Sequence, residues 1–122
     1  MATLRLEKDL QQFESEAISF VTLEFPSEDS LTVIIIHITP EQNSPYFTSK
    51  VSFTLTFPES YPIDPPKLKC INKIFHPNIN YNGSVCLPLV REDWSPTVSL
   101  SSIIYGLIFI LTYPEGDDAL EP

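Results

Sequence analysis

The chain has 122 residues, of which 43% are hydrophobic and 19% charged, so it can form one small domain but not two. Seven basic against sixteen acidic residues give a formal net charge of −9, which argues against a nucleic-acid surface and against docking on anionic lipid. Two cysteines are too few for a disulfide framework, and the charged N-terminus lacks a secretory pattern. We therefore expect a single domain over residues 1–122, located in the cytoplasm, the nucleus or both, with no nucleic-acid or membrane partner.

Residues 3–16 predict an N-terminal helix. Its apolar side chains recur at i, i+4 and i+7 and form one stripe: Leu6, Leu10 and Phe13. Thr3 is a candidate N-cap. Arg5 and Lys8 lie off the apolar stripe, so we expect both side chains to face water.

Four later segments predict the strands of an antiparallel meander, because short turns separate them: residues 18–25, 31–38, 50–57 and 67–71. The third alternates most cleanly, with Val51, Phe53, Leu55 and Phe57 on the core side. Cys70 alternates with Leu68 on the last strand, which predicts a buried packing role for this cysteine. The nine residues 58–66 contain four prolines, which exclude helix and ladder pairing there and make Tyr61–Pro62 a candidate cis bond.

No period holds over residues 72–96, yet this segment is too apolar for disorder, which indicates an ordered and functional loop. Cys86 within it is either a nucleophile or a buried structural cysteine. His76 either pairs with a thiol or holds the loop through backbone hydrogen bonds. Asn78 is either a turn residue or a donor to an oxyanion.

Ser99 predicts the N-cap of a second helix that runs to about Leu111. Its apolar residues cover almost the whole circumference, and such a helix has to be covered on all sides. The sheet can cover one side only, and the chain ends at Pro122 after a short acidic tail. We therefore expect this helix to be exposed, covered by a second copy through self-association, or packed in an altered way.

Four motifs occur in order: Tyr61-Pro-Ile-Asp-Pro-Pro66, His76-Pro-Asn78, Cys86-Leu87 and Trp94-Ser-Pro96. Together they resemble the ubiquitin-conjugating enzyme family, over essentially the whole chain. Within it, Arg91-Glu-Asp-Trp94 and residues 102–107 are most similar to carriers of the Nedd/Rub ubiquitin-like modifier, and ordinary ubiquitin carriers are the near alternative. The resemblance implies an α+β fold with an N-terminal helix, a four-stranded antiparallel meander, a long active-site loop and a central helix.

The resemblance also implies an acyl relay. An activating enzyme would pass the modifier to Cys86 as a thioester, and a substrate lysine would then attack the carbonyl carbon. Asn78 would stabilise the oxyanion or hold the loop, and His76 would shape that loop. Asp118 matches the acidic residue that orients, or helps to deprotonate, the incoming lysine, as suits a cationic amine.

Partners follow from the same resemblance. Ile63 and Pro96 match ligase contacts, and the outward face of the first helix, with Arg5 and Lys8, resembles the docking surface for the activating enzyme. A cullin is the expected substrate of a Nedd/Rub carrier. No cofactor is expected, because the upstream activating enzyme uses the ATP.

Three departures from the family pattern stand out. Pro88 replaces the usual Asp or Asn two residues after the cysteine and removes a backbone N–H there. Glu115-Gly116 and Ala119 replace a more proline-rich pattern around Asp118. The two further C-terminal helices and the N-terminal tail of the Nedd/Rub carriers are absent, so we expect a truncated or naturally shortened carrier.

Two other functions are compatible with the residues. A non-catalytic regulator of the same fold would bind modifier or ligase without transfer. A thiol hydrolase would use Cys86 and His76, and is the least favoured. Two histidines and two cysteines without CxxC spacing make a weak case for zinc, and no glycine-rich phosphate loop occurs.

Overall fold

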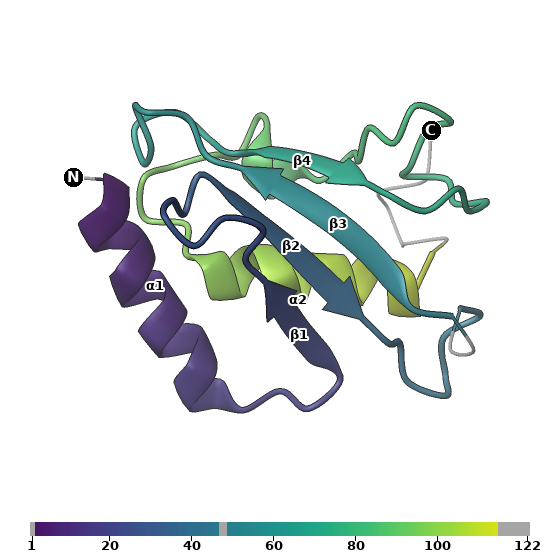
Figure 1. Ribbon diagram of the computed structural model, residues 1–122. Helices are drawn as coiled ribbons and strands as arrows, with labels where there is room; N and C mark the ends of the chain where they lie inside the picture. The colour runs from purple at the N-terminus through teal and green to yellow at the C-terminus, as the bar shows by residue number, and fades with distance from the viewer. Residues whose placement is uncertain (1, 47–48, 115–122) are drawn as a thin grey trace.

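The computed structural model describes residues 2–46 and 49–114 (Figure 1). In chain order its elements are α1 (Ala2–Glu16), β1 (Val21–Glu24), β2 (Val33–Ile38), β3 (Val51–Thr56), β4 (Lys67–Cys70), the short 3-10 helix η1 (Pro88–Val90) and α2 (Leu100–Thr112). This arrangement confirms the predicted α+β fold, with a helix at the start, four strands, a long loop and a second helix.

The N-terminal boundaries differ from the predicted ones. Helix α1 already includes Thr3, so the prediction that this residue is the N-cap is wrong. Strand β1 is shorter than predicted because the chain turns at Ala17, whose φ is 50°, and only pairs with β2 from Val21 onward. At α2 the predicted cap is confirmed, since the Ser99 hydroxyl accepts a hydrogen bond from the Ser102 N–H at 3.1 Å.

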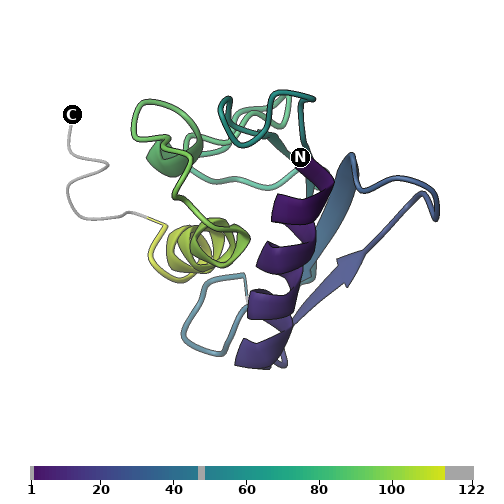
Figure 2. The same cartoon turned by 90° about the vertical axis from the view of Figure 1, so that its left-hand side faces the viewer.

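The sheet is the predicted meander, with the order β1-β2-β3-β4 and every neighbouring pair antiparallel. Alternate residues of the two central strands face the core and are fully buried: Ile34, Ile36, Ile38, Val51, Phe53 and Leu55. Cys70, opposite Phe53, is buried with them, as predicted. Both helices lie on this one side of the sheet (Figure 2).

Helix α2 buries its aliphatic residues against the sheet, α1 and the long loop: Leu100, Ile103, Ile104, Leu107, Ile110 and Leu111. The opposite side carries an aromatic ridge that is about half exposed, with Tyr105 at 47%, Phe109 at 49% and Tyr113 at 55%. The expectation of an incompletely covered helix is therefore confirmed for its aromatic side only.

A buried carboxylate joins α1 to the rest of the domain. Asp9 is 5% exposed and accepts hydrogen bonds from the Arg5 guanidinium at 3.2 Å, the Tyr61 hydroxyl at 3.2 Å and the Leu100 N–H at 3.4 Å. The last contact places a negative charge at the first turn of α2, where the helix dipole favours it. Burial, followed by the charge of Asp9, raises the pKa of Tyr61 to about 12, so its phenol stays a donor.

Arg5 extends this junction to the loop before α2. Its two terminal nitrogens donate to the carbonyls of Pro96 at 2.6 Å and Val98 at 2.7 Å, and its guanidinium lies over the Tyr61 ring. The prediction that Arg5 faces water is therefore wrong. The physical reason is that carbonyl groups more than ninety positions away along the chain compete successfully with solvent for its donors.

Candidate active site

Cys86 lies on the long loop with its thiol exposed, between two buried neighbours, Val85 and Leu87. The flanking side chains anchor the loop in the core, so the cysteine has to point outward. Cys70 is the opposite case, because burial raises the pKa of its thiol and keeps it protonated. Of the two free cysteines, Cys86 is therefore the one able to react with a large external partner.

A short hairpin brings Asn78 next to Cys86. The Cys86 N–H donates to the Asn78 carbonyl at 2.7 Å, and the Asn80 N–H donates to the Ser84 carbonyl at 3.0 Å. The Asn78 carboxamide makes no hydrogen bond to any residue that the structure describes and is half-buried beside this loop. Its N–H groups are thus available as donors, as an oxyanion site requires.

The turn of this hairpin requires a glycine. Gly83 has a φ of 89°, and a Cβ at this position would lie 2.6 Å from the Cys70 carbonyl oxygen. The backbones of Gly83 and Cys70 lie this close together because the Cys70 N–H donates to the Gly83 carbonyl at 2.8 Å. The turn therefore fixes the hairpin that carries Cys86 onto the end of β4.

We expect Gly83→Ala to lower the free energy of unfolding by about 1–3 kcal/mol, because it adds left-handed strain and a backbone clash. Gly106→Ala is the matched control: its Cβ would meet only the ends of two leucine side chains, Leu87 at 3.2 Å and Leu89 at 3.6 Å. Its change should stay within about 1 kcal/mol, since helix propensity favours alanine. Urea unfolding measures both, and equal losses would contradict this account of Gly83.

His76 is a structural residue of this loop. Its Nε2–H donates to the Ile110 carbonyl at 2.7 Å, and its Nδ1 accepts the Asn78 N–H at 2.9 Å. Both ring nitrogens are therefore engaged by backbone groups and neither is free to deprotonate a thiol. Burial lowers the pKa of His76, and the hydrogen bond to the Ile110 carbonyl opposes this shift only in part. The ring is therefore neutral near pH 7.

This neutral ring predicts a loss of stability in mild acid. The unfolded histidine titrates at its ordinary pKa of 6.5 and the folded one lower, so the unfolded state binds more protons between those values. The contribution of His76 is therefore complete above pH 6.5 and declines as the pH falls toward the folded pKa. Urea unfolding between pH 7.5 and 5.5 should show a steeper decline for the wild type than for His76→Gln. Parallel curves would exclude this role.

Two residues that the sequence analysis missed support His76. The Tyr46 ring stacks on the imidazole with centroids 5.6 Å apart, and its hydroxyl donates to the Phe75 carbonyl. The Ser44 hydroxyl donates to the Leu111 carbonyl at 2.6 Å, next to the Ile110 carbonyl that His76 uses. The sequence signal that could have identified them is a serine and a tyrosine on either side of Pro45, in a turn.

The predicted ligase contacts lie on two exposed loops that Trp94 holds together. The Trp94 indole N–H lies 3.2 Å from the carbonyls of both Pro62 and Ile63. The Ile63 side chain is 72% exposed, and Pro96 is exposed two residues beyond the tryptophan. The structure therefore places the loop of Ile63 against the loop that carries Trp94 and Pro96.

On α1, Lys8 is exposed as predicted, whereas Arg5 is held inward as described above. Asp118 and the departures at Glu115, Gly116 and Ala119 lie outside the described residues. Within residues 2–46 and 49–114 no group of three His, Cys, Asp or Glu side chains could hold a metal ion. In the same part of the chain no helix is long and apolar enough to span a bilayer.

Comparisons with a family model and with known proteins point to one family. Residues 5–122 match the family model described as "Ubiquitin-conjugating enzyme". The chain is 41% identical to "NEDD8-conjugating enzyme UBC12" of Eremothecium gossypii, over 98% of this chain and 63% of that protein. It is 39% identical to "NEDD8-conjugating enzyme ubc12" of Schizosaccharomyces pombe, over 98% of this chain and 66% of that protein. The chain thus spans about two thirds of the length of these relatives.

Solved structures agree. The structure of S. cerevisiae Ubc12 superposes with a TM-score of 0.83 at 39% identity, covering 98% of this chain and 65% of that one. Human ubiquitin-conjugating enzyme E2 G1 superposes with a TM-score of 0.84 at 28% identity, covering 91% of this chain and 94% of that one. The matched residues include the exposed cysteine, the adjacent asparagine and the loops around them, so the chain belongs to the ubiquitin-conjugating enzyme family.

Proposed function

We propose that this chain carries a ubiquitin-like modifier of the NEDD8 type as a thioester on Cys86. The proposal rests on one observation: Cys86 is exposed, and its backbone N–H donates to the carbonyl of Asn78, so that the two residues are neighbours across the hairpin. The names of the relatives, which are NEDD8-conjugating enzymes, support the choice of modifier. No cofactor is needed by this chain, since the activating enzyme spends the ATP. The cytoplasm and the nucleus are the compartments in which it would act.

The reaction consists of two acyl transfers. In the first, the Cys86 thiolate attacks the thioester carbonyl on the activating enzyme, and the thiolate of that enzyme leaves. In the second, a neutral lysine amine attacks the carbonyl carbon on Cys86 and forms an amide bond. The carbon–sulfur bond breaks, the Cys86 thiolate leaves, and the proton lost by the amine passes to water. Each transfer passes through an oxyanion, to which the Asn78 carboxamide can donate. Asp118 is proposed to orient the lysine.

Partners are assigned to three exposed surfaces. The activating enzyme would dock on the outward face of α1, which carries Lys8 and Leu4, the latter 72% exposed. A ligase would contact Ile63 and Pro96, and a cullin lysine would accept the modifier. The aromatic ridge of α2 is the surface through which two copies of the chain would associate.

The test is a loading assay with ATP, in which NEDD8 and ubiquitin are each supplied with the matching activating enzyme. We expect a reductant-sensitive adduct with NEDD8 and a weaker one with ubiquitin. A stronger adduct with ubiquitin would overturn the choice of modifier. Binding of NEDD8 with no adduct would favour the non-catalytic alternative, and peptide cleavage without ATP would favour a hydrolase.

A further prediction concerns Asn78. When the modifier is already attached to Cys86, Asn78→Ala should slow its discharge to free lysine about 10²–10³-fold, because one oxyanion donor is lost. Asn80→Ala is the matched control, since it removes an exposed carboxamide from the same hairpin and should leave discharge unchanged. Gel quantification of the remaining thioester over time measures both rates. Equal rates for the wild type and Asn78→Ala would show that the carboxamide takes no part.

A further inference from the structure

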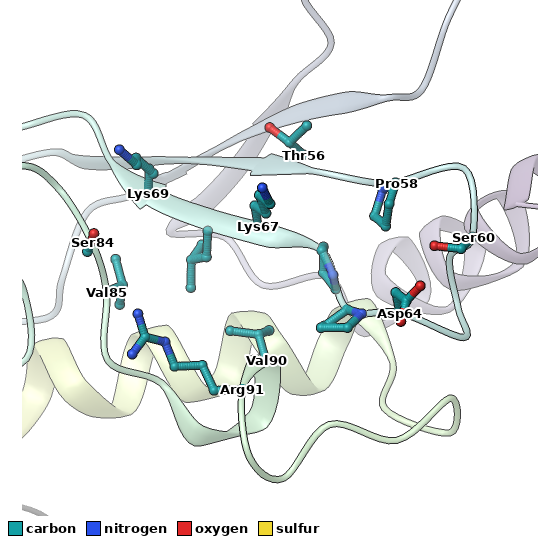
Figure 3. A pocket seen from close by; sticks show the side chains of 13 residues that line it. Thr56, Pro58, Ser60, Asp64, Lys67, Lys69, Ser84, Val85, Val90 and Arg91 are labelled. Carbon is teal, nitrogen blue, oxygen red and sulfur yellow. The ribbon is translucent and has the colours of Figure 1, made fainter.

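A hollow of about 670 Å³ lies between β4 and η1. Figure 3 shows β4 along one side and Val90 and Arg91 along the other. Ser84 and Val85 close one end, and Asp64 with Ser60 lies toward the other. None of these residues has a part in the proposed thioester chemistry.

The floor of the hollow is apolar. Leu68, Val85 and Val90 line it and are themselves at most 8% exposed, and Pro66 beside them is buried. An aliphatic side chain placed here would lose water without displacing a polar group of the protein. The floor therefore suits one apolar anchor.

Basic side chains outnumber acidic ones in the lining of the hollow, where Asp64 is the single acid, although the chain as a whole carries a net charge of −9. Lys67, Lys69 and Arg91 line the rim of the hollow and are three of the seven basic residues. All three are exposed, and no carboxylate of the described residues forms a salt bridge with them. Such a cluster complements a negatively charged partner.

The edge of β4 is partly paired, because Lys69 forms an antiparallel bridge with Ser84, and one backbone group beyond that bridge lies toward the hollow. The Cys70 N–H points away from β3, because it donates to the Gly83 carbonyl at 2.8 Å. In an antiparallel pair such directions repeat at every second residue, so the Leu68 N–H points outward as well, toward the hollow. A short extended peptide beside Leu68 could accept this hydrogen bond, whereas the edge at Lys69 is already paired with Ser84.

We propose that this hollow binds a short, extended, acidic segment of a partner protein. One apolar side chain of the segment lies on the floor at Leu68 and Val90, and carboxylates on either side reach Lys67, Lys69 and Arg91. Three exposed cations on an acidic protein are too few to hold a nucleic acid. A small inorganic anion would leave the apolar floor unused, whereas an acidic peptide uses floor, rim and strand edge together.

The experiment uses the full chain, labelled with ¹⁵N, and the peptide acetyl-Glu-Asp-Leu-Asp-Glu-amide. We expect the largest amide shifts at residues 67–69 and 84–91. Two control peptides test the two parts of the recognition: Gln-Asn-Leu-Asn-Gln removes the charge, and Glu-Asp-Gly-Asp-Glu removes the anchor. Each should bind at least about threefold more weakly, and salt should weaken the acidic peptide as screening predicts.

A matched pair of double variants tests the position of the site. Lys67→Ala/Arg91→Ala should weaken the acidic peptide about tenfold, given a few-fold for each exposed charge pair. Lys50→Ala/Lys73→Ala removes the same charge from exposed positions that do not line the hollow, and should leave the affinity within about twofold. Circular dichroism establishes that both variants are folded.

Several results would overturn the proposal. Equal weakening by the two double variants would mean attraction by overall charge, and shifts confined to another face would mean another site. Full displacement by inorganic phosphate would mean an anion site without peptide recognition. Shifts that depend on protein concentration alone would make the occupant a second copy. Loading of Cys86 is measured separately on the same variants, so failure of the peptide site leaves the thioester proposal standing.

Discussion

Replacing Cys86 by alanine is expected to abolish the reductant-sensitive adduct completely. The thioester needs an exposed sulfur, and burial with a raised pKa prevents Cys70 from substituting for it. The measurement is a non-reducing gel after incubation with activating enzyme, ATP and NEDD8. Cys86→Ser should give, at most, an ester that survives reductant.

The matched control is Cys70→Ala, which removes the other thiol and leaves Cys86 in place. It should retain the adduct, although loss of a buried sulfur will lower stability somewhat. If the adduct persists in Cys86→Ala, or disappears in folded Cys70→Ala, Cys86 is not the residue that carries the thioester.

The largest expected effect on stability is that of Asp9→Ala. Three donors from different parts of the chain point at this buried carboxylate, namely Arg5, Tyr61 and the N–H of Leu100. Its removal leaves a half-buried guanidinium without its counter-ion and two donors without an acceptor. We expect the free energy of unfolding to fall by about 3–5 kcal/mol, as for other broken buried ion pairs.

Urea unfolding measures this change, with Glu7→Ala as the control because Glu7 is an exposed acid on the same helix. The control should stay within about 0.5 kcal/mol of the wild type. A loss below about 1 kcal/mol for Asp9→Ala would mean that solvent replaces the lost contacts. Arg5→Ala and the double variant would then show how strongly the two residues are coupled.

The parts of the fold that local pattern controls could be predicted from the sequence. The alternation from Val51 to Phe57 gave the correct core face of β3, because the side-chain period of a strand is two whatever it pairs with. The Ser99 cap and the apolar side of α2 were also local signals. Strand ends were less predictable, since β1 begins only where β2 is long enough to pair with it.

The site was predictable to the extent that it is local in sequence. Cys86 and Asn78 are eight positions apart and meet across one hairpin. The error at Arg5 and the omission of Asp9 have another cause, because their partners lie in the loop before α2 and in α2 itself. Asp9 falls within the apolar stripe between Leu6 and Phe13, and that placement of a charge was the missed signal.

Trp94 is the single tryptophan of the chain, and its indole joins the loop of Ile63 to the loop of Pro96. Its ring also lies 5.8 Å from that of Tyr61, which contacts α1 through Asp9. The fluorescence emission of this protein thus arises from an indole at its proposed ligase-binding end. Ligase association could be followed in real time by a shift in that emission, with no dye attached.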